Sequence, residues 1–405
     1  MYLKIINFLR IFYYAKFKFT NPKSEKLIIF DNSDIFALKE TPLKKFDYFL
    51  FEDRGYLITK IYISLDILRL IFLNRKYGIK FAYKIAIIKI VNPNLIITFI
   101  HNSENFSNLA KVMHKNYNFL AIQNSSFYYR IREANFLKKK YKIPIKNYFI
   151  PRLLCFSKFD KKNYIKESKV KIEKFDIIGS LRLENFKNTI KKKKIKINKN
   201  KYDICLLSEV DSWELKDSKL DFKFAKLIKF VIRYSQEEKK NLIFALKRPQ
   251  VKNIKGISPQ AKYVIQGYYN EQKWYKKYFN ESEYKFLKKR FKFQYPYSSY
   301  EASIESRVTI ASMSTMLREV FSLKKKILAC NFTSNKIYDF PIKGISSINF
   351  DCDYEYFKKR LDKILEISSN KYFSAAKLKK DHDLIENKNN KTISKIISIV
   401  KDYLQ

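Results

Sequence analysis

The chain has 405 residues, of which 46% are hydrophobic and 17% aromatic, so it has enough apolar surface for two domains and is not disordered. It carries 83 Lys and Arg against 39 Asp and Glu, a formal net charge of +44 at pH 7. Lys, Asn, Ile, Tyr and Phe are all abundant and glycine occurs only 6 times, as an AT-rich coding sequence would produce, so the charge alone does not identify a nucleic-acid-binding protein.

The cysteines and the apolar stretches restrict the class of protein further. The four cysteines are widely spaced and form no CxxC pair, which argues against a zinc site. Secretory signals are not evident, and charges interrupt the most apolar stretch, 57–73, which we interpret as an amphipathic helix. We therefore expect a cytoplasmic protein with reduced thiols, drawn by its charge to anionic lipid headgroups.

Residues 1–25 form a basic N-terminal segment. The stretch 1–19 mixes aromatic residues with Lys and Arg and contains no acid. As a helix it would place Ile5, Phe8, Leu9 and Phe12 on one face, which predicts a peripheral helix at the inner face of the plasma membrane. The alternatives are a helix packed on the domain and a poorly ordered start.

Strand and helix patterns alternate over 26–190, which we take as the first domain. In open parallel α/β sheets, ligands bind beyond the carboxyl ends of the strands. The residues that follow the three clearest strand patterns are Asp31 and Asn32, His101 and Asn102, and Gln123 and Asn124. We predict ligand contacts for Asn32, Asn102, Gln123 and Asn124, and catalytic roles for Asp31 and for His101, whose alternative is a structural, hydrogen-bonded histidine.

A strand pattern over 175–180 ends the first domain. Gly179 would permit a sharp turn there, and Ser180 and Arg182 follow it. The basic run 187–201 contains no aromatic residue to stack on bases, so we predict an interdomain linker over 191–201 and no nucleic-acid partner.

The second domain, 202–385, again places polar residues after buried strands. Glu209 follows the strand pattern 202–207 and is a third catalytic candidate. Lys247 and Arg248 follow the pattern 242–246, where two cations suit a diphosphate or phosphodiester.

The stretch 308–331 predicts a strand, a helix and a second strand. Ser312, Ser314 and Thr315 lie at the strand-to-helix turn, where a helix N-terminus can hold phosphate. Glu319 lies one turn further and could hold the hydroxyls of a ribose. The plainer interpretation is an N-cap and a surface glutamate, and side chains filling the turn would refute the phosphate hypothesis.

Two acids resemble a metal motif, but another explanation fits them better. Asp351 and Asp353 have Asp-x-Asp spacing and directly precede the helical pattern 354–367, where capping accounts for them. We therefore expect neither a metal nor a cofactor. The final helical pattern, within 386–405, is expected to cross back to the first domain.

The pattern S-x-S-T-x-x-R-E over 312–319, followed by a Lys-rich turn and a strand ending in Cys-Asn, resembles the C-terminal half of GT-B glycosyltransferases. It is most similar to the surface-carbohydrate biosynthesis transferases found beside capsule and O-antigen genes. Earlier in the chain, further segments occur in the same order as in that family: NPNLIITF, FLAIQN, FDIIGSLRL, YDICLLSEV and LIFALKRP. Relatives usually have Gly after Gln-Asn, whereas Ser125 stands here, which puts a close backbone approach at that point in doubt.

The resemblance implies an α/β fold of GT-B type, with two doubly wound Rossmann-like domains facing across a cleft. It implies metal-independent transfer of a sugar from a nucleotide-activated donor, with a lean towards CMP-linked acidic sugars, to a surface glycan or its lipid-linked precursor. The residues it places at the donor are Gly179, Ser180, Arg182, Lys247, Arg248, Ser312, Ser314, Thr315 and Glu319. It makes the first domain the acceptor side, with acceptor contacts from Asn32, Asn102, Gln123 and Asn124. Three alternatives remain open: a glycerophosphate or polyol-phosphate transferase on the same scaffold, a sugar-nucleotide 2-epimerase-like enzyme, and a non-catalytic basic protein that binds membranes or nucleic acid.

Overall fold

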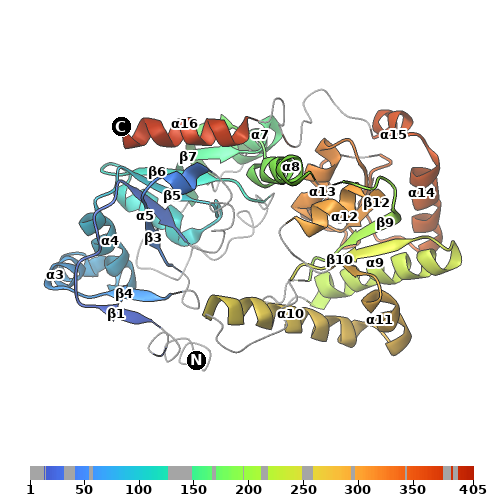
Figure 1. Ribbon diagram of the computed structural model, residues 1–405, viewed down its shortest axis with the longest axis horizontal. Helices are drawn as coiled ribbons and strands as arrows, with labels where there is room; N and C mark the ends of the chain where they lie inside the picture. The colour runs from blue at the N-terminus through green and yellow to red at the C-terminus, as the bar shows by residue number, and fades with distance from the viewer. Residues whose placement is uncertain are drawn as a thin grey trace. The chain divides into compact units, whose positions relative to one another are not determined.

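The computed structural model describes residues 13, 15–31, 42–53, 58–125, 148–166, 170–194, 196–210, 218–248, 259–292, 297–342, 344–376, 385 and 391–405. The chain divides into two compact units (Figure 1). Unit 1 comprises Met1–Asn185 and Glu386–Gln405, and unit 2 comprises Phe186–Ile385. Within the described residues each unit contains one six-stranded sheet whose neighbouring strands are all parallel. The predicted α/β class is confirmed.

The sheet of unit 1 has the order β3-β2-β5-β6-β7-β8. Because the first strand, β2, lies between the second, β3, and the third, β5, the strand order reverses between β2 and β5. Crossover helices can leave a crevice at the carboxyl ends of the strands at such a reversal. The strands are β2 (Leu27–Phe30), β3 (Phe49–Phe51), β5 (Leu95–Thr98), β6 (Asn118–Ile122), β7 (Tyr148–Cys155) and β8 (Val170–Ile177).

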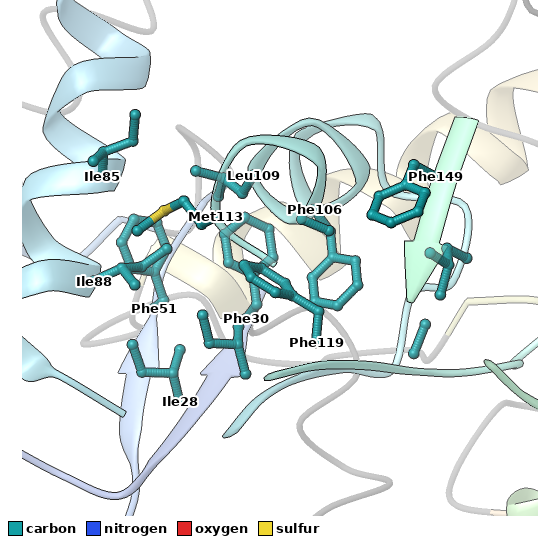
Figure 2. Packing of buried hydrophobic residues seen from close by; sticks show 14 of the residues in the cluster. Ile28, Phe30, Phe51, Ile85, Ile88, Phe106, Leu109, Met113, Phe119 and Phe149 are labelled. Atoms are coloured by element: carbon teal, nitrogen blue, oxygen red, sulfur yellow. The ribbon is translucent and has the colours of Figure 1, made fainter. Parts of the chain in front are cut away.

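Both faces of this sheet are covered, as the near-continuous apolar strands predict. Ile28 and Phe30 point into one core, which Figure 2 shows, where Phe30 stacks on Phe51 at a ring-centroid distance of 5.2 Å. Leu27 and Ile29 point into the opposite core because side chains alternate along a strand. The helices of the first core include α4 (Ile79–Val91), α5 (Glu104–Met113) and α7 (Lys158–Lys166), and Ile67 of a further helix, described below, also contributes.

The opposite face of the sheet is covered by the end of the chain. Helix α16 (Thr392–Leu404) buries Ile396 and Val400 in that core, together with Leu43 from the short helix η2 (Pro42–Lys45). The hydroxyl of Thr392 also donates to the carbonyl of Ile178. The C-terminal residues therefore belong to unit 1, although the rest of unit 1 precedes unit 2 in the sequence.

A small accessory layer lies beside α4. Strands β1 (Lys16–Lys18) and β4 (Lys60–Tyr62) form a two-stranded parallel sheet, and β4 leads into helix α3 (Leu65–Leu73). A short helix, η3 (Arg75–Tyr77), then connects α3 to α4, against which α3 packs (Figure 1). Ser64 caps α3 by accepting a hydrogen bond from the backbone of Ile67 at 3.2 Å.

The sheet of unit 2 has the order β11-β10-β9-β12-β13-β14, which is 3-2-1-4-5-6 in chain order and reverses between β9 and β12. Its strands are β9 (Tyr202–Leu207), β10 (Leu242–Ala245), β11 (Phe291–Lys292), β12 (Ser306–Ala311), β13 (Lys326–Cys330) and β14 (Ser347–Ile348). Its helices are α9 (Ser218–Glu237), α10 (Pro259–Tyr278), α11 (Glu281–Lys288), α12 (Ser298–Ile304), α13 (Thr315–Ser322), α14 (Tyr354–Glu366) and α15 (Ser369–Ala375).

An aromatic cluster joins α9 to α14 in unit 2. Phe230 of α9 contacts Phe332, Tyr354 and Phe357, with ring centroids 5.6 to 5.8 Å apart. Such contacts contribute beyond the area that they bury. They hold two helices that are far apart in sequence against the same sheet.

Two predicted boundaries differ from the structure, and a third prediction lies mostly outside the described residues. The linker predicted over 191–201 starts inside helix α8 (Leu181–Lys193), and the units divide at Asn185–Phe186 within this helix, because its first turns bury apolar side chains such as Leu183 and Phe186. The stretch 57–73 is not one helix, since β4 precedes α3. The N-terminal helix lies mostly outside the described residues, and Lys16–Lys18 form a strand. None of the described helices is both long and apolar enough to span a bilayer.

Candidate functional site

The strongest candidate site lies at the carboxyl ends of β9 and β12 in unit 2. Glu209 comes two residues after β9, and Ser312 directly follows β12. These are the two strands between which the order of the sheet reverses. Polar residues from two distant parts of the sequence therefore meet where parallel α/β sheets bind their ligands.

Glu209 occupies the turn that the sequence predicted to be open. Its Oε2 accepts a hydrogen bond from the backbone N–H of Ser312, and its Oε1 accepts one from Met313 at 2.9 Å. The backbone N–H of Ser312 is therefore already taken by a carboxylate, and the predicted contact of Ser312 with a donor stays a prediction. The same geometry shows that the turn can hold two anionic oxygens at once.

The half-buried position of Glu209 changes its acidity. Burial raises its pKa to about 7, against the hydrogen bonds from Met313 and Ser312 and the positive charge of Lys247, which favour the carboxylate. A carboxyl group with this pKa can accept or donate a proton near neutrality, as a general base requires. Glu209 therefore lies at the edge of the sheet where ligands are expected and has a pKa that suits a general base.

A second carboxylate, Glu271 of α10, holds the neighbouring strand ends in place. It is fully buried and accepts hydrogen bonds from the hydroxyl of Ser208 at 2.5 Å and from the backbone N–H groups of Lys247 at 3.2 Å and Arg248 at 3.0 Å. Burial raises its pKa, although these hydrogen bonds and one from Tyr275 oppose the rise. Because Glu271 fixes the backbone after β10, the half-buried side chains of Lys247 and Arg248 leave the sheet at a defined point.

The N-terminus of α13 is capped as expected from its sequence. Ser314 is the N-cap, and its Oγ accepts from the backbone of Met316 at 3.3 Å. Thr315 begins the helix. This N-terminus lies next to Ser312 and Met313, so its dipole adds to the positive potential around Glu209.

Glu319 is buried rather than exposed. Only 4% of its surface is accessible, and its Oε2 accepts a hydrogen bond from the hydroxyl of Tyr300 at 2.7 Å. The surface glutamate considered as the plainer interpretation is therefore wrong. The role of Glu319 in ribose binding stays a prediction, with one of its oxygens already used by Tyr300.

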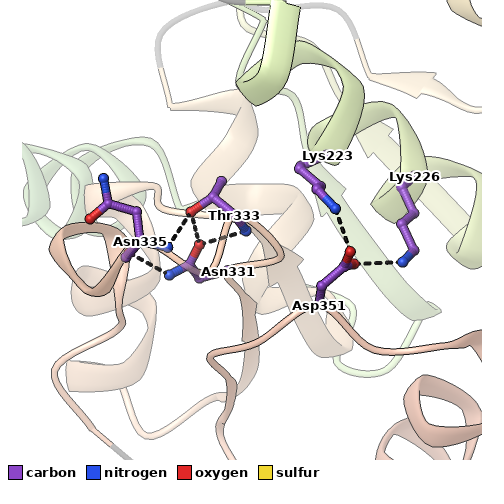
Figure 3. Close-up of polar contacts among 6 residues, drawn as sticks. All are labelled: Lys223, Lys226, Asn331, Thr333, Asn335 and Asp351. Atoms are coloured by element: carbon purple, nitrogen blue, oxygen red, sulfur yellow. Dashed lines mark hydrogen bonds and ion pairs between the residues drawn. The ribbon is translucent and has the colours of Figure 1, made fainter.

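The Asp-x-Asp pair has the structural role that capping predicts. Asp353 caps α14 by accepting from the backbone of Tyr356 at 2.8 Å. Asp351 bonds to Lys223 and Lys226 of α9, as Figure 3 shows, and these bonds lower its pKa although burial opposes them. Among the described residues, no cluster of three or more His, Cys, Asp or Glu side chains is arranged to hold a metal ion.

The polar residue after β13 serves its own loop. Asn331 is buried and donates to the carbonyl of Asn335 at 2.9 Å and to Asp339 at 2.7 Å. Its Oδ1 accepts from the backbone and the hydroxyl of Thr333 (Figure 3). This strand end is therefore closed by an internal network.

In unit 1, Asp31 stands at the carboxyl end of β2, beside the reversal of the strand order. Its backbone is left-handed, with φ 73°, and its N–H donates to the carbonyl of Phe51 at 2.9 Å. Aspartate is among the few residues that adopt this conformation readily. The next predicted residue, Asn32, lies outside the described residues.

His101 is fully buried, and it connects two strand ends. Its Nδ1 lies 3.2 Å from Oδ1 of Asn124 and 3.4 Å from the backbone N of Asn124, which follows β6. Burial lowers its pKa to about 4, although the contact with Asn124 and the charge of Asp160 act in the opposite direction. The ring is neutral at pH 7 and a weak base, so the structural alternative fits His101 better than a catalytic role. Asn102 beside it is half-buried.

Gln123 belongs to a buried polar network. Its Nε2 donates to Asp160 and to the carbonyl of Ser125, both at 3.0 Å, and its Oε1 accepts from the backbone of Phe156 at 2.9 Å. Asp160 also accepts from the hydroxyl of Ser157 at 2.8 Å. These bonds fix the loops after β6 and β7, and the predicted contact of Gln123 with an acceptor stays a prediction.

A small hollow in unit 1 is lined both by residues predicted to contact the donor and by residues predicted to contact the acceptor. Gly179, with φ 87°, makes the predicted turn, and Ser180 accepts from the backbone of Leu183 at 3.2 Å at the start of α8. The hollow is lined by Phe99, Ile122, Gln123, Asn124, Phe156, Ser180, Leu181 and Arg182. Ser180 and Arg182, predicted for the donor, therefore lie beside Gln123 and Asn124, predicted for the acceptor.

Glu271, Tyr300 and Asp160 were not predicted from the sequence. Each lies inside or next to a helix, far in sequence from the strand end or helix that it contacts. Polar residues at strand ends can be predicted because they directly follow an apolar run in the sequence. The partners of a buried side chain on a helix are set only by folding.

No protein-family model and no curated protein matches this chain. Solved structures match over nearly its whole length. UDP-GlcNAc 2-epimerase from Neisseria meningitidis bound to UDP-GlcNAc is 10% identical, covering 93% of this chain and 99% of that one with a TM-score of 0.47. The wall teichoic acid polymerase TagF is 11% identical, covering 94% and 90%, with a TM-score of 0.49. Anabaena Alr3699/HepE in complex with UDP and glucose is 10% identical, covering 93% and 99%, with a TM-score of 0.44. At these TM-scores and identities, the matches carry no argument about activity.

Proposed function

We propose that this chain is a glycosyltransferase of GT-B type that transfers a sugar from a nucleotide-activated donor to a surface glycan or its lipid-linked precursor. The observation that supports it most is the pair of half-buried cations after β10, Lys247 and Arg248, whose backbone Glu271 holds in place. The N–H groups of Ser312 and Met313 are already taken by Glu209, so the proposal does not use them for the phosphate. Backbone N–H groups at a helix N-terminus also favour the phosphate oxygens of a nucleotide. The resemblance of the sequence favours CMP-linked acidic sugars as donors.

In this proposal the donor phosphate lies beside Glu209, at Ser314 and Thr315. Lys247 and Arg248 neutralise its charge. In the reaction an acceptor oxygen forms a bond to the anomeric carbon, the bond from that carbon to the phosphate oxygen breaks, and the acceptor proton passes to a carboxylate. The positive N-terminus of α13 stabilises the negative charge that develops on the leaving phosphate.

Glu209 is our first candidate for the base, because its pKa of about 7 allows it to take a proton near neutrality. Asp31 of unit 1 is the second candidate, and His101, with a pKa of about 4, is the weakest. We assign acceptor contacts to the strand ends of unit 1, at Asn102 and Asn124.

A thermal-shift measurement with CMP, CDP, UDP and GDP tests the nucleotide site, because a ligand that binds only the folded state raises the melting temperature. We expect one base to be preferred. The double variant Lys247→Gln/Arg248→Gln should weaken its binding by about 10- to 100-fold, since each charge-assisted hydrogen bond contributes roughly 1.5–3 kcal/mol before losses to solvent.

The matched control is Lys239→Gln/Lys240→Gln, which removes the same charge next to the opposite end of β10. It should leave nucleotide affinity within about twofold of the parent chain, because exposed charges act weakly at a distance in physiological salt. Equal losses in both double variants would mean that the whole-chain charge attracts the nucleotide. A chain that no nucleotide stabilises would refute the proposed function.

A further inference from the structure

Helix α3 exposes large apolar side chains to solvent. Leu65 is 86% exposed, Leu68 51%, Phe72 61% and Leu73 62%. Leu65, Leu68 and Phe72 are spaced three and four residues apart, so they form one stripe along the helix. Ile79, just beyond η3, is 74% exposed and extends the apolar surface to the start of α4.

The fold does not need this stripe for its core. The opposite side of α3 buries Ile67 and packs Leu70 and Ile71 against the core of unit 1. Figure 1 shows α3 and α4 as neighbours, and the two helices pack against each other. A run of exposed leucines outside the core is typical of a surface that binds a partner.

Exposed cations surround the stripe. Arg69 lies on the stripe itself, Arg75 and Lys76 belong to η3, and Lys80 is the second residue of α4. The guanidinium of Arg75 lies 4.0 Å from the ring centroid of Phe72, so apolar and cationic groups share one surface.

Acids are nearly lacking from this stretch of sequence. Asp66 is the one acid between residues 65 and 80, and it accepts a hydrogen bond from Asn21 at 2.7 Å. We call the surface formed by Leu65, Leu68, Arg69, Phe72, Leu73, Arg75, Lys76, Ile79 and Lys80 the α3 patch.

We propose that the α3 patch docks on the surface of an anionic lipid bilayer. Leucine and phenylalanine side chains gain free energy by entering the boundary between headgroups and acyl chains, and Lys and Arg beside them are attracted to anionic headgroups. Nucleic acid would use the cations but would leave the leucines in water, so the composition of the patch favours lipid. The proposal does not depend on the nucleotide site in unit 2.

Co-sedimentation of the full chain with vesicles of phosphatidylcholine, with or without about one third phosphatidylglycerol, tests the proposal. The variant Leu68→Glu/Phe72→Glu should lower the partition coefficient for the anionic vesicles by about 100-fold, roughly tenfold for each side chain that no longer enters the interface. The matched control is Phe222→Glu/Tyr269→Glu in unit 2, where the two residues are 62% and 46% exposed; it should change partitioning by less than about threefold.

A second pair of variants separates the charge of the patch from the charge of the whole chain. Arg69→Gln/Arg75→Gln/Lys80→Gln should remove most of the preference for phosphatidylglycerol, because each cation near the surface contributes about 1 kcal/mol. Lys191→Gln/Lys192→Gln/Lys193→Gln, at the exposed end of α8, removes the same charge and should retain that preference.

Equal partitioning of the parent chain and Leu68→Glu/Phe72→Glu would overturn the proposal. So would a drop in melting temperature of the glutamate variant without lipid, which would show that another segment of the chain covers the patch. Binding to double-stranded DNA but not to vesicles would assign the patch to nucleic acid. The nucleotide-induced thermal shift should be the same in all these variants, so failure here leaves the proposed function untouched.

Discussion

The variant Glu209→Gln tests the electrostatic description of the candidate site most directly. Because the pKa of Glu209 rises from 4.5 to about 7 on folding, its carboxylate form is less stable in the folded chain than in the unfolded chain. Each tenfold change in proton affinity corresponds to about 1.36 kcal/mol, so ionisation of Glu209 lowers the free energy of unfolding by roughly 3 kcal/mol. Because solvent reaches part of its side chain, we expect the measured value to be about 2 kcal/mol.

The sign of the pH dependence follows from proton uptake. Between pH 4.5 and 7 the folded chain binds more protons than the unfolded chain, so the free energy of unfolding contributed by this group falls as pH rises and is constant above about 7. Glutamine has no such dependence. It also loses one hydrogen bond, because its amide group cannot accept from both Ser312 and Met313, at a cost of about 1 kcal/mol.

We therefore expect Glu209→Gln to be less stable than the parent chain at pH 5 by about 1 kcal/mol and more stable at pH 8 by about 1 kcal/mol. For a domain of this size the difference corresponds to roughly 2–4 °C in each direction, measured by calorimetry of both chains across the pH range. The control Glu366→Gln, an exposed residue of α14, reports what the loss of one negative charge from this basic chain does by itself. A stability difference for Glu209→Gln that stays constant from pH 5 to 8 would refute the reasoning.

Three further predictions follow from the contacts around the two sheets. Tyr300→Phe removes the hydroxyl that donates to buried Glu319 and should lower the free energy of unfolding by about 1–3 kcal/mol, measured by urea titration; an unchanged value would mean that water replaces the hydroxyl. If His101 is structural, His101→Gln should destabilise unit 1 without shifting the pH–rate profile above pH 5, and a shifted profile there would return it to the catalytic candidates. Deletion of Thr392–Leu404 removes Val400 and exposes the core residues Leu27 and Ile29 that α16 covers. We therefore expect loss of hydrogen-exchange protection throughout unit 1, and retained protection would contradict the packing of α16.

Much of the fold could be predicted from the sequence because strands buried on both faces are locally conspicuous. The strands β2 and β10 are apolar throughout, β5 is apolar up to Thr98, and β9 ends in the apolar run 204–207. These strands and β12 were each predicted within about two residues of their observed ends. The capping roles of Asp353 and Ser314 were equally local, since a cap depends on residues three positions apart.

The sequence by itself determined two parallel α/β sheets with polar residues at their strand ends, because hydrophobic periodicity and capping act over a few neighbouring residues. Only the tertiary structure decided how those polar residues are used. It placed the carboxylate of Glu209 on the turn at Ser312, put Glu271 under Lys247 and Arg248, and buried Glu319 against Tyr300. These contacts join residues 19 to 103 positions apart, and their energies depend on desolvation and distance, which exist only once the strands have packed.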